Sequence, residues 1–383
     1  MYEINRRALT VPGDQLVTLI NEANVIKNES AARKDARYGA SRVKISSYME
    51  NTALFDLFGF DMNDIYQKPN LALDVELRAK LFWLDNSWDD QTLPLTVSAG
   101  NHYFSMTLFG LRINYRPDGV PVFARHEMAG DPDLSRLKPF DFETTGEMPL
   151  VHQRYREMKR ISAEKYKGEV KIQFPPFSRG PLDIAVQLRG YENFIGDCSE
   201  NPDFVHSLMS FIVSGRNRYN KRAADFRGGA AQAPFIADDW VNVPFISPDI
   251  FGEFIVPAYR AVRENEGAVT GFHTCGAIGP VVIKLLETLP EIKTLDVSGW
   301  NDITELDKIL DKGVAFQVSL INSFVLCASP EEHRRKLEEI KKIARGREVS
   351  LVAQSIVKLF DSFFDSVYAM NRFIDLAHNI LNN

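Results

Sequence analysis

Residues 269–276 read Val-Thr-Gly-Phe-His-Thr-Cys-Gly, and this stretch predicts how the rest of the chain is organised. Val269 to Phe272 is typical of a short strand, and the run from Ile278 to Leu289 is typical of the helix after it. His273 and Cys275 are two residues apart, so in an extended segment their side chains project from the same face. An imidazole beside a thiol suits a soft cation such as zinc. The stretch therefore predicts two ligands of a metal site at the end of a buried strand.

Other short apolar runs share this pattern of a strand followed by a helix. Three of the expected helices begin alike, with a capping side chain before proline, at Asn201-Pro202, Ser247-Pro248 and Ser329-Pro330. Strands that alternate with helices indicate a parallel sheet. The seven candidate strands are Pro94–Ala99, Val170–Phe174, Ala233–Ala237, Val269–Phe272, Leu295–Val297, Ala315–Leu320 and Val349–Ala353.

Seven strands come close to the eight of a closed (β/α)8 barrel of the TIM type, which is the fold we expect. An open doubly wound sheet is the rival, but no strand is followed by the glycine fingerprint that binds phosphate. Residues 1–93 are expected to form an N-terminal helical extension, with one helix near Ser46 to Phe58. Residues 94–383 are expected to form the barrel, with a proline-dotted insertion up to about residue 150.

Composition excludes several classes of partner. The 383 residues carry a formal net charge of −6, which argues against nucleic acid or an anionic membrane as the main partner. No run approaches the ~18 apolar residues of a membrane span, and the first ten residues lack the apolar core of a secretion signal. The three cysteines, Cys198, Cys275 and Cys327, are odd in number and far apart, which favours a reduced, cytoplasmic setting.

In a barrel, functional groups gather at the carboxyl ends of the strands. We expect His273 and Cys275 to bind metal, and Asp239 to act as a further ligand or a proton-transfer group. Adjacent side chains diverge, so at most one of Asp238 and Asp239 can point into the mouth, and we favour Asp239. The polar or aromatic residues expected to contact a small-molecule substrate are His102, Asp238, Trp240, Asn322 and Gln354.

Several segments, taken in order, resemble the uroporphyrinogen decarboxylase superfamily, and in particular its zinc-dependent, corrinoid-linked methyltransferase branch. They are Gly180-Pro181-Leu182-Asp183, Leu188-Arg189-Gly190-Tyr191-Glu192, Asn201-Pro202-Asp203, Ala237-Asp238-Asp239-Trp240, Ser247-Pro248-Asp249 and His273-Thr274-Cys275-Gly276. The resemblance implies a (β/α)8 barrel in which a His-x-Cys pair and a later cysteine hold zinc. It also implies that the zinc keeps an acceptor thiol as a thiolate, which attacks a methyl group carried on the cobalt of a corrinoid protein.

The chain departs from that branch at the third ligand, since no cysteine stands near Ala353, where the family's later cysteine should fall. Cys327, Asp239 and Asp296 remain open as the third ligand. The decarboxylase branch fits less well, because Arg33, Arg37 and Tyr38 echo only the spacing of its N-terminal signature. The Asp-x-His-x-x-Gly motif of a corrinoid domain is absent, so a corrinoid would arrive on another protein.

We therefore expect an enzyme that moves a methyl group between a corrinoid protein and a small molecule, with zinc at the barrel mouth. One alternative is a metal-free lyase acting on a carboxylated small molecule through Asp239. Another is a barrel without activity that binds a corrinoid protein.

Overall fold

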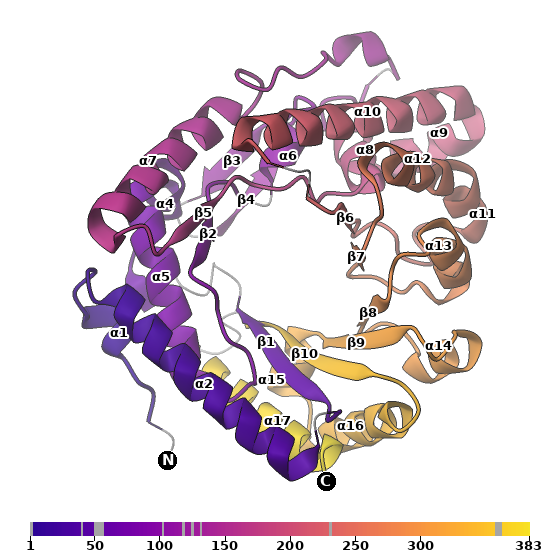
Figure 1. Cartoon of the computed structure of the whole chain (residues 1–383). Helices are drawn as coiled ribbons and strands as arrows, with labels where there is room; N and C mark the ends of the chain where they lie inside the picture. The colour runs from indigo at the N-terminus through magenta and orange to yellow at the C-terminus, as the bar shows by residue number, and fades with distance from the viewer. Residues whose placement is uncertain are drawn as a thin grey trace.

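The computed structural model describes residues 3–39, 41–49, 57–101, 103–116, 119–123, 126–130, 132–229, 232–356 and 362–383. Within these ranges, two helices come first and eight parallel strands then alternate with helices to form a (β/α)8 barrel, seen along its axis in Figure 1. The first helices are α1 (Arg7–Thr10) and α2 (Leu16–Tyr38). The strands are β1 (Lys44–Met49), β2 (Thr96–Ser98), β5 (Lys171–Gln173), β6 (Phe235–Ala237), β7 (Gly271–His273), β8 (Thr294–Ser298), β9 (Ala315–Leu320) and β10 (Val349–Ile356).

Parallel hydrogen bonding joins the strands in three groups, in the orders β1-β10-β9-β8, β2-β5 and β6-β7. A single bridge from Arg179 to Ala237 links the backbone after β5 to β6. Helices surround the ring (Figure 1). They are α5 (Pro69–Asn86), α7 (Met148–Tyr166), α10 (Pro202–Arg227), α12 (Val256–Glu266), α13 (Val282–Thr288), α14 (Ile303–Ile309), α16 (Pro330–Ala344) and α17 (Phe363–Leu381).

Shorter elements fill the connections between strands and outer helices. They are α4 (Met62–Gln67), α6 (Phe104–Thr107), the hairpin β3 (Ile113–Arg116) and β4 (Gly119–Phe123), η1 (Leu134–Arg136), α8 (Pro181–Arg189), α9 (Tyr191–Glu200), α11 (Pro248–Ile250), η2 (Phe251–Ile255), η3 (Gly279–Val281) and α15 (Asn322–Cys327). None of the helices in the described part of the chain is long and apolar enough to cross a membrane.

All seven predicted strands are confirmed, and so are the three helices expected to begin at proline, although the side chain of Asn201 does not cap its helix. The Ser247 hydroxyl accepts from the Ile250 amide, and Ser329 forms the predicted capping box with Glu332. The helix expected near Ser46 to Phe58 is wrong at its start, because residues 44–49 form β1 and pair with β10. Residues 50–56 of that expected helix lie outside the described residues. The domain boundary between residues 93 and 94 stays a prediction, although β1 shows that the first segment contributes a strand to the barrel sheet.

Carboxylates satisfy the edge of β1 that faces away from β10. The amides of Ile45 and Ser47 donate to Asp90 and Asp89 over 3.0 Å each. Among the described residues no ladder joins β1 to β2. Unpaired edge amides would otherwise cost free energy wherever water cannot reach them. The segment after α5 therefore completes this side of the ring with side chains instead of a strand.

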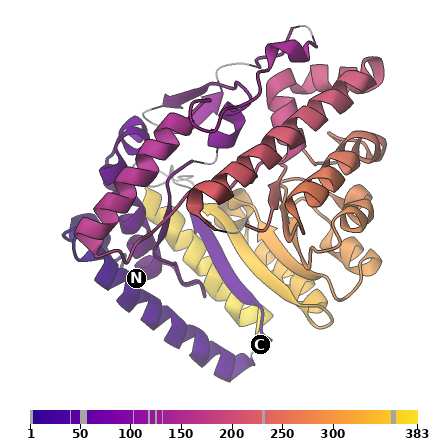
Figure 2. The same cartoon turned by 45° about the horizontal axis from the view of Figure 1, so that its top comes forward.

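Positive side chains on α2 balance these buried acids. Lys27 donates to the Asp89 carboxylate over 3.0 Å, and Lys34 donates to Asp90 over 2.7 Å. Lys34 also lies 2.9 Å from Nε2 of His378, on α17. Figure 2 shows α2 beside α17, and the hydrogen bond confirms that they touch. The charged cluster thus joins the first helices of the chain to the last one.

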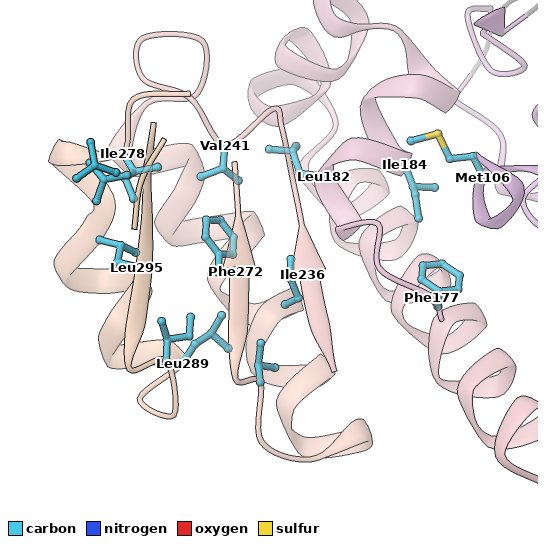
Figure 3. Close-up of a cluster of buried hydrophobic side chains, with 14 of the residues drawn as sticks. Met106, Phe177, Leu182, Ile184, Ile236, Val241, Phe272, Ile278, Leu289 and Leu295 are labelled. Carbon is cyan, nitrogen blue, oxygen red and sulfur yellow. The ribbon is translucent and has the colours of Figure 1, made fainter. Parts of the chain in front are cut away.

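Apolar packing decides which strand side chains face the barrel interior. Ile236 of β6, Phe272 of β7 and Leu295 of β8 are buried, and Figure 3 shows them within one cluster. Because side chains alternate along a strand, the next residue on each strand faces the other way, into the ring. Those next residues are Ala237, His273 and Asp296.

The charged cluster predicts a pH dependence of stability. Burial, with the nearby charges of Lys34 and Arg42, lowers the pKa of His378 to about 4, against the attraction of Asp90. An unfolded histidine titrates near pH ~6.5, so below that pH the unfolded chain takes up a proton that the folded chain refuses. Stability should therefore fall between pH ~6.5 and ~4, by on the order of 3 kcal/mol from this group.

The variant His378→Gln should flatten that part of the profile, because glutamine keeps an acceptor for Lys34 but does not titrate. Urea unfolding of both proteins at several pH values between ~7 and ~4 measures the difference. Parallel profiles for the two proteins would contradict the prediction.

Candidate metal centre

The pairing of β6 with β7 brings the predicted site residues together. Ala237 lies opposite His273 in the parallel ladder, and the Asp238 amide donates to the His273 carbonyl over 2.9 Å. Asp239 and Cys275 each stand two residues beyond these partners, so both side chains emerge at the carboxyl end of the strand pair. The register of one short ladder therefore sets the position of three candidate ligands.

The ligand atoms of Asp239, His273 and Cys275 all lie within 4.8 Å of one another. Nε2 of His273 is 3.5 Å from Sγ of Cys275 and 3.6 Å from Oδ1 of Asp239. Zinc bonds of ~2.0 to ~2.3 Å in a tetrahedron place neighbouring ligand atoms ~3.3 to ~3.6 Å apart. The donor types and the separations around the imidazole thus fit zinc. Among the described residues no other group of this kind occurs.

A second carboxylate fixes the imidazole ring. Nδ1 of His273 donates to Oδ2 of Asp296 over 2.6 Å, and the hydroxyl of Ser319 donates to Oδ1 of Asp296 over 2.6 Å. These two hydrogen bonds leave Nε2 of His273, the nitrogen that faces Asp239 and Cys275, free to act as a ligand. Asp296 therefore acts through His273 and does not join the three-residue group.

Without a metal, His273 and Cys275 both hold protons firmly. Burial opposes a charge on His273, but its hydrogen bonds with Asp296 and Cys275 raise the pKa of the ring to about 10. The contact with His273 would lower the pKa of Cys275, but burial and the Asp239 carboxylate outweigh it and raise that pKa. A cation that binds here must displace both protons, so metal binding should weaken as the pH falls.

Arg179 holds Asp239 in its ionised form. Nη1 of Arg179 donates to Oδ2 of Asp239 over 2.8 Å, and the same atom donates to Oδ2 of Asp183 over 2.7 Å. Burial would raise the pKa of Asp239, but the charge of Arg179 lowers it. The other oxygen, Oδ1, faces the candidate site and accepts from the Cys275 amide over 3.3 Å. Asp239 is therefore available as an anionic ligand.

Asp238 turns away from the mouth and is fully buried. Its two oxygens accept from the amides of Leu182 and Asp183 and from the hydroxyl of Tyr259. Burial and the Asp183 carboxylate raise the pKa of Asp238. Burial and the Asp239 carboxylate raise the pKa of Asp183 to about 6. This geometry leaves Asp238 no exposed surface for a ligand and makes it a positioning residue.

The same geometry explains why a glycine precedes Pro181-Leu182-Asp183. A Cβ atom at Gly180 would lie 2.2 Å from Oδ2 of Asp238, so only glycine allows this close approach. Gly276 is equally constrained, because a Cβ there would lie 2.2 Å from the side chain of Asn242. The two glycines belong to the motifs that the sequence analysis singled out.

The remaining predicted residues lie in different places. Trp240 stacks on Tyr191, with ring centroids 5.1 Å apart, and stands next to the candidate ligands. Asn322 begins α15 just after β9, whereas Gln354 lies inside β10. His102 lies outside the described residues. Whether Trp240, Asn322, Gln354 or His102 touches a substrate stays a prediction.

Of the three candidates for the third ligand, Asp239 alone joins the cluster. Cys327 is exposed at the end of α15. Arg179 was missed in the sequence, although its position just after the strand end at residues 171–173 was a usable signal. A charged residue directly before Gly180 and beyond a strand end would be expected at the barrel mouth.

Comparisons with known proteins agree with this architecture. The sequence model of the uroporphyrinogen decarboxylase (URO-D) family matches residues 103–351. A methylated-thiol–coenzyme M methyltransferase of Methanosarcina mazei is 25% identical over 138 residues, which are 36% of this chain and 35% of that protein, so the match spans about a third of the relative's length. A solved methyltransferase structure from Methanosarcina mazei has a TM-score of 0.60 at 16% identity and covers 87% of this chain and 94% of its own, which shows the fold alone.

Zinc content tests the centre directly. Purified wild-type protein should retain about one equivalent of zinc after dialysis, and Cys275→Ser or His273→Ala should retain less than about a tenth. Asp296→Asn keeps all three ligands and should weaken zinc binding by about 10–100-fold, because the imidazole loses its anionic partner. Elemental analysis and competition with a zinc chelator provide the measurements.

Cys327→Ser is the matched control and should bind zinc like the wild type. Loss of zinc in that variant, or full retention in Cys275→Ser, would contradict the assignment of the ligands.

Proposed function

The chain belongs to the uroporphyrinogen decarboxylase family, and from that premise we propose that it is a zinc-dependent methyltransferase acting between a small molecule and a corrinoid carried on a separate protein.

The cluster of Asp239, His273 and Cys275 is the observation that carries this proposal. Acid catalysis of a decarboxylation needs no thiol, whereas one thiolate, one imidazole and one carboxylate form a ligand set that zinc favours. Three protein ligands are also the usual number in catalytic zinc sites, which keep one position for the substrate. The name of the methylated-thiol relative supports the same reaction class.

Each residue of the centre has a separate task in this proposal. Asp239 and Cys275 supply two negative charges, which together balance a divalent cation, and His273 supplies a neutral ligand. Asp296 keeps the proton of His273 on Nδ1, and Arg179 keeps Asp239 ionised and correctly turned. Bound zinc would supply a Lewis acid that holds the sulfur or oxygen of the small molecule in its anionic form.

The carboxylate ligand distinguishes this proposed centre from one built on two cysteines. Asp239 is a harder ligand than a thiolate, so it should donate less charge to the cation and leave it a stronger Lewis acid. Trp240 and Tyr191 form a stacked aromatic pair next to Asp239. Such a pair would exclude water from one side of the centre and strengthen electrostatic interactions there.

Methyl transfer to and from free cobalamin tests the proposal. Zinc-loaded protein should transfer a methyl group either from methylcobalamin to a small thiol such as 2-mercaptoethanol, or to cob(I)alamin from dimethyl sulfide or an aryl methyl ether. The absorbance change between methylcobalamin and cob(I)alamin reports both directions. Asp239→Asn and Cys275→Ser should lower the rate by about 100-fold or more, because each removes a ligand.

Cys327→Ser should keep the wild-type rate, since its side chain lies outside the cluster. A wild-type rate no higher than that of Asp239→Asn in both directions would contradict the proposal. Activity on a carboxylated compound that survives both metal removal and Cys275→Ser would favour the metal-free lyase instead.

A further inference from the structure

A cavity of about 430 Å³ lies among β1, β2 and β5. Ser98 and Gln173 line it from the carboxyl ends of β2 and β5. Ser178 also lines it, and the next residue, Arg179, donates to Asp239. Two adjacent residues therefore connect the cavity wall to the candidate metal centre. The apolar and aromatic part of its wall includes Tyr48, Ile65, Tyr66, Val75, Phe104 and Pro175.

Arg154 brings a buried positive charge to this cavity. Its side chain comes from α7, lines the cavity, and leaves the residue only 7% exposed. Nε donates to the Ala99 carbonyl over 2.9 Å, and Nη1 donates to the carbonyls of Ile65 and Tyr66. In the described part of the chain, Nη2 has no hydrogen-bond partner and no carboxylate lies within 4.0 Å of the guanidinium. Burial lowers the pKa of Arg154, and the nearby Glu76 and Glu147 oppose this shift without forming an ion pair with the guanidinium.

A buried charge without an ion pair is costly, and among the described residues no carboxylate lies close enough to form one with Arg154. Three backbone carbonyls hold the guanidinium in place, so it cannot swing to solvent without losing these bonds. A guanidinium that is fixed, buried and open on one side matches an anionic ligand group. One positive charge matches a carboxylate better than a phosphate, which carries more negative charge than a single arginine can balance.

Glu76 is the other ionisable group on the cavity wall. Among the described residues it has neither an ion pair nor a hydrogen bond. Burial raises the pKa of Glu76, against the opposing charges of Lys80 and Arg154. This shift favours the protonated carboxyl, which can donate a hydrogen bond to an anion.

We propose that this cavity binds the carboxylate of an aromatic acid at Arg154, with the aromatic ring against Tyr48, Tyr66 and Phe104. The volume suits a single substituted ring. The inference rests on the proposed function in one respect only, since it names aryl carboxylates as the class of small molecule that the methyl transfer would use. The binding site itself follows from the cavity and the unpaired guanidinium.

Benzoate and its neutral isostere benzamide probe the site in the zinc-loaded, full-length protein. Isothermal titration should show that benzoate binds at least about tenfold more tightly than benzamide, as expected when one ligand group pairs with a buried charge. Arg154→Gln should remove that preference. Arg160→Gln is the matched control, because it removes the same charge from an exposed position on α7, where Arg160 pairs with Glu164. Equal binding of the two probes by the wild type, or a preference that survives in Arg154→Gln, would overturn the inference.

Arg154→Lys covers the case in which Arg154→Gln fails to fold. A shorter reach and fewer donors should weaken benzoate binding by about 3- to 10-fold and leave benzamide binding unchanged. Unchanged benzoate binding in this variant would overturn the inference. Glu76→Gln keeps the shape of a neutral acid and should bind benzoate within about threefold of the wild type. A larger loss of benzoate affinity would mean that binding needs a negative charge on Glu76, as a cation site would. That result would also overturn the inference.

The two proposals fail separately. Benzoate binding that persists in zinc-free protein without methyl transfer would refute the proposed function alone. Methyl transfer with cobalamin but no preference for benzoate would refute this inference alone.

Discussion

The register between β6 and β7 is the constraint on which the candidate centre depends. Ala237 pairs with His273, so the residues two positions further along each strand reach the barrel mouth together. The fit of Ile236 and Phe272 in the buried cluster holds that register (Figure 3). A shift by one residue would turn Phe272 into the ring and His273 out towards the helices, at the cost of burying the imidazole in an apolar layer. Apolar packing on one face thus aligns polar groups on the other.

Charge is distributed unevenly around Arg179. Three carboxyl groups, those of Asp183, Asp238 and Asp239, lie close together, and the Arg179 guanidinium contacts Asp183 and Asp239. Like charges ~4 Å apart repel by about 4 kcal/mol in surroundings of intermediate polarity, so the three acids cannot all ionise freely. Burial raises the pKa values of Asp183 and Asp238, and Arg179 lowers that of Asp239. The negative charge is therefore favoured at Asp239, the carboxylate that faces the candidate metal centre.

The barrel wall between β1 and β2 is closed by side chains, whereas hydrogen-bonded strands form most of the ring. There, Asp89 and Asp90 accept from the amides of β1, and Lys27 and Lys34 on α2 balance them. Side chains can do this at a cost in charge burial that a strand ladder avoids. Because no described strand pairs with β1 at this edge, β2 and β5 stand apart from it, and a cavity remains beside them. Its buried Arg154 suits an anion in the same way that Lys27 suits Asp89.

The sequence by itself determined the local elements and the spacing of chemically distinctive residues. Alternating apolar runs gave seven of the strands, Ser-Pro and Asn-Pro pairs gave three helix starts, and the interval of two placed His273 beside Cys275. The strand β1 escaped notice, because its six residues include two serines, and Ser47 is stabilised by a carboxylate 42 positions away. Only the tertiary structure chose Asp239 over Cys327 and Asp296 and brought Arg179 and Arg154 to their sites. The positions of these residues depend on strand register and on contacts between distant segments. Neither produces a periodic pattern in the sequence from which it could be predicted.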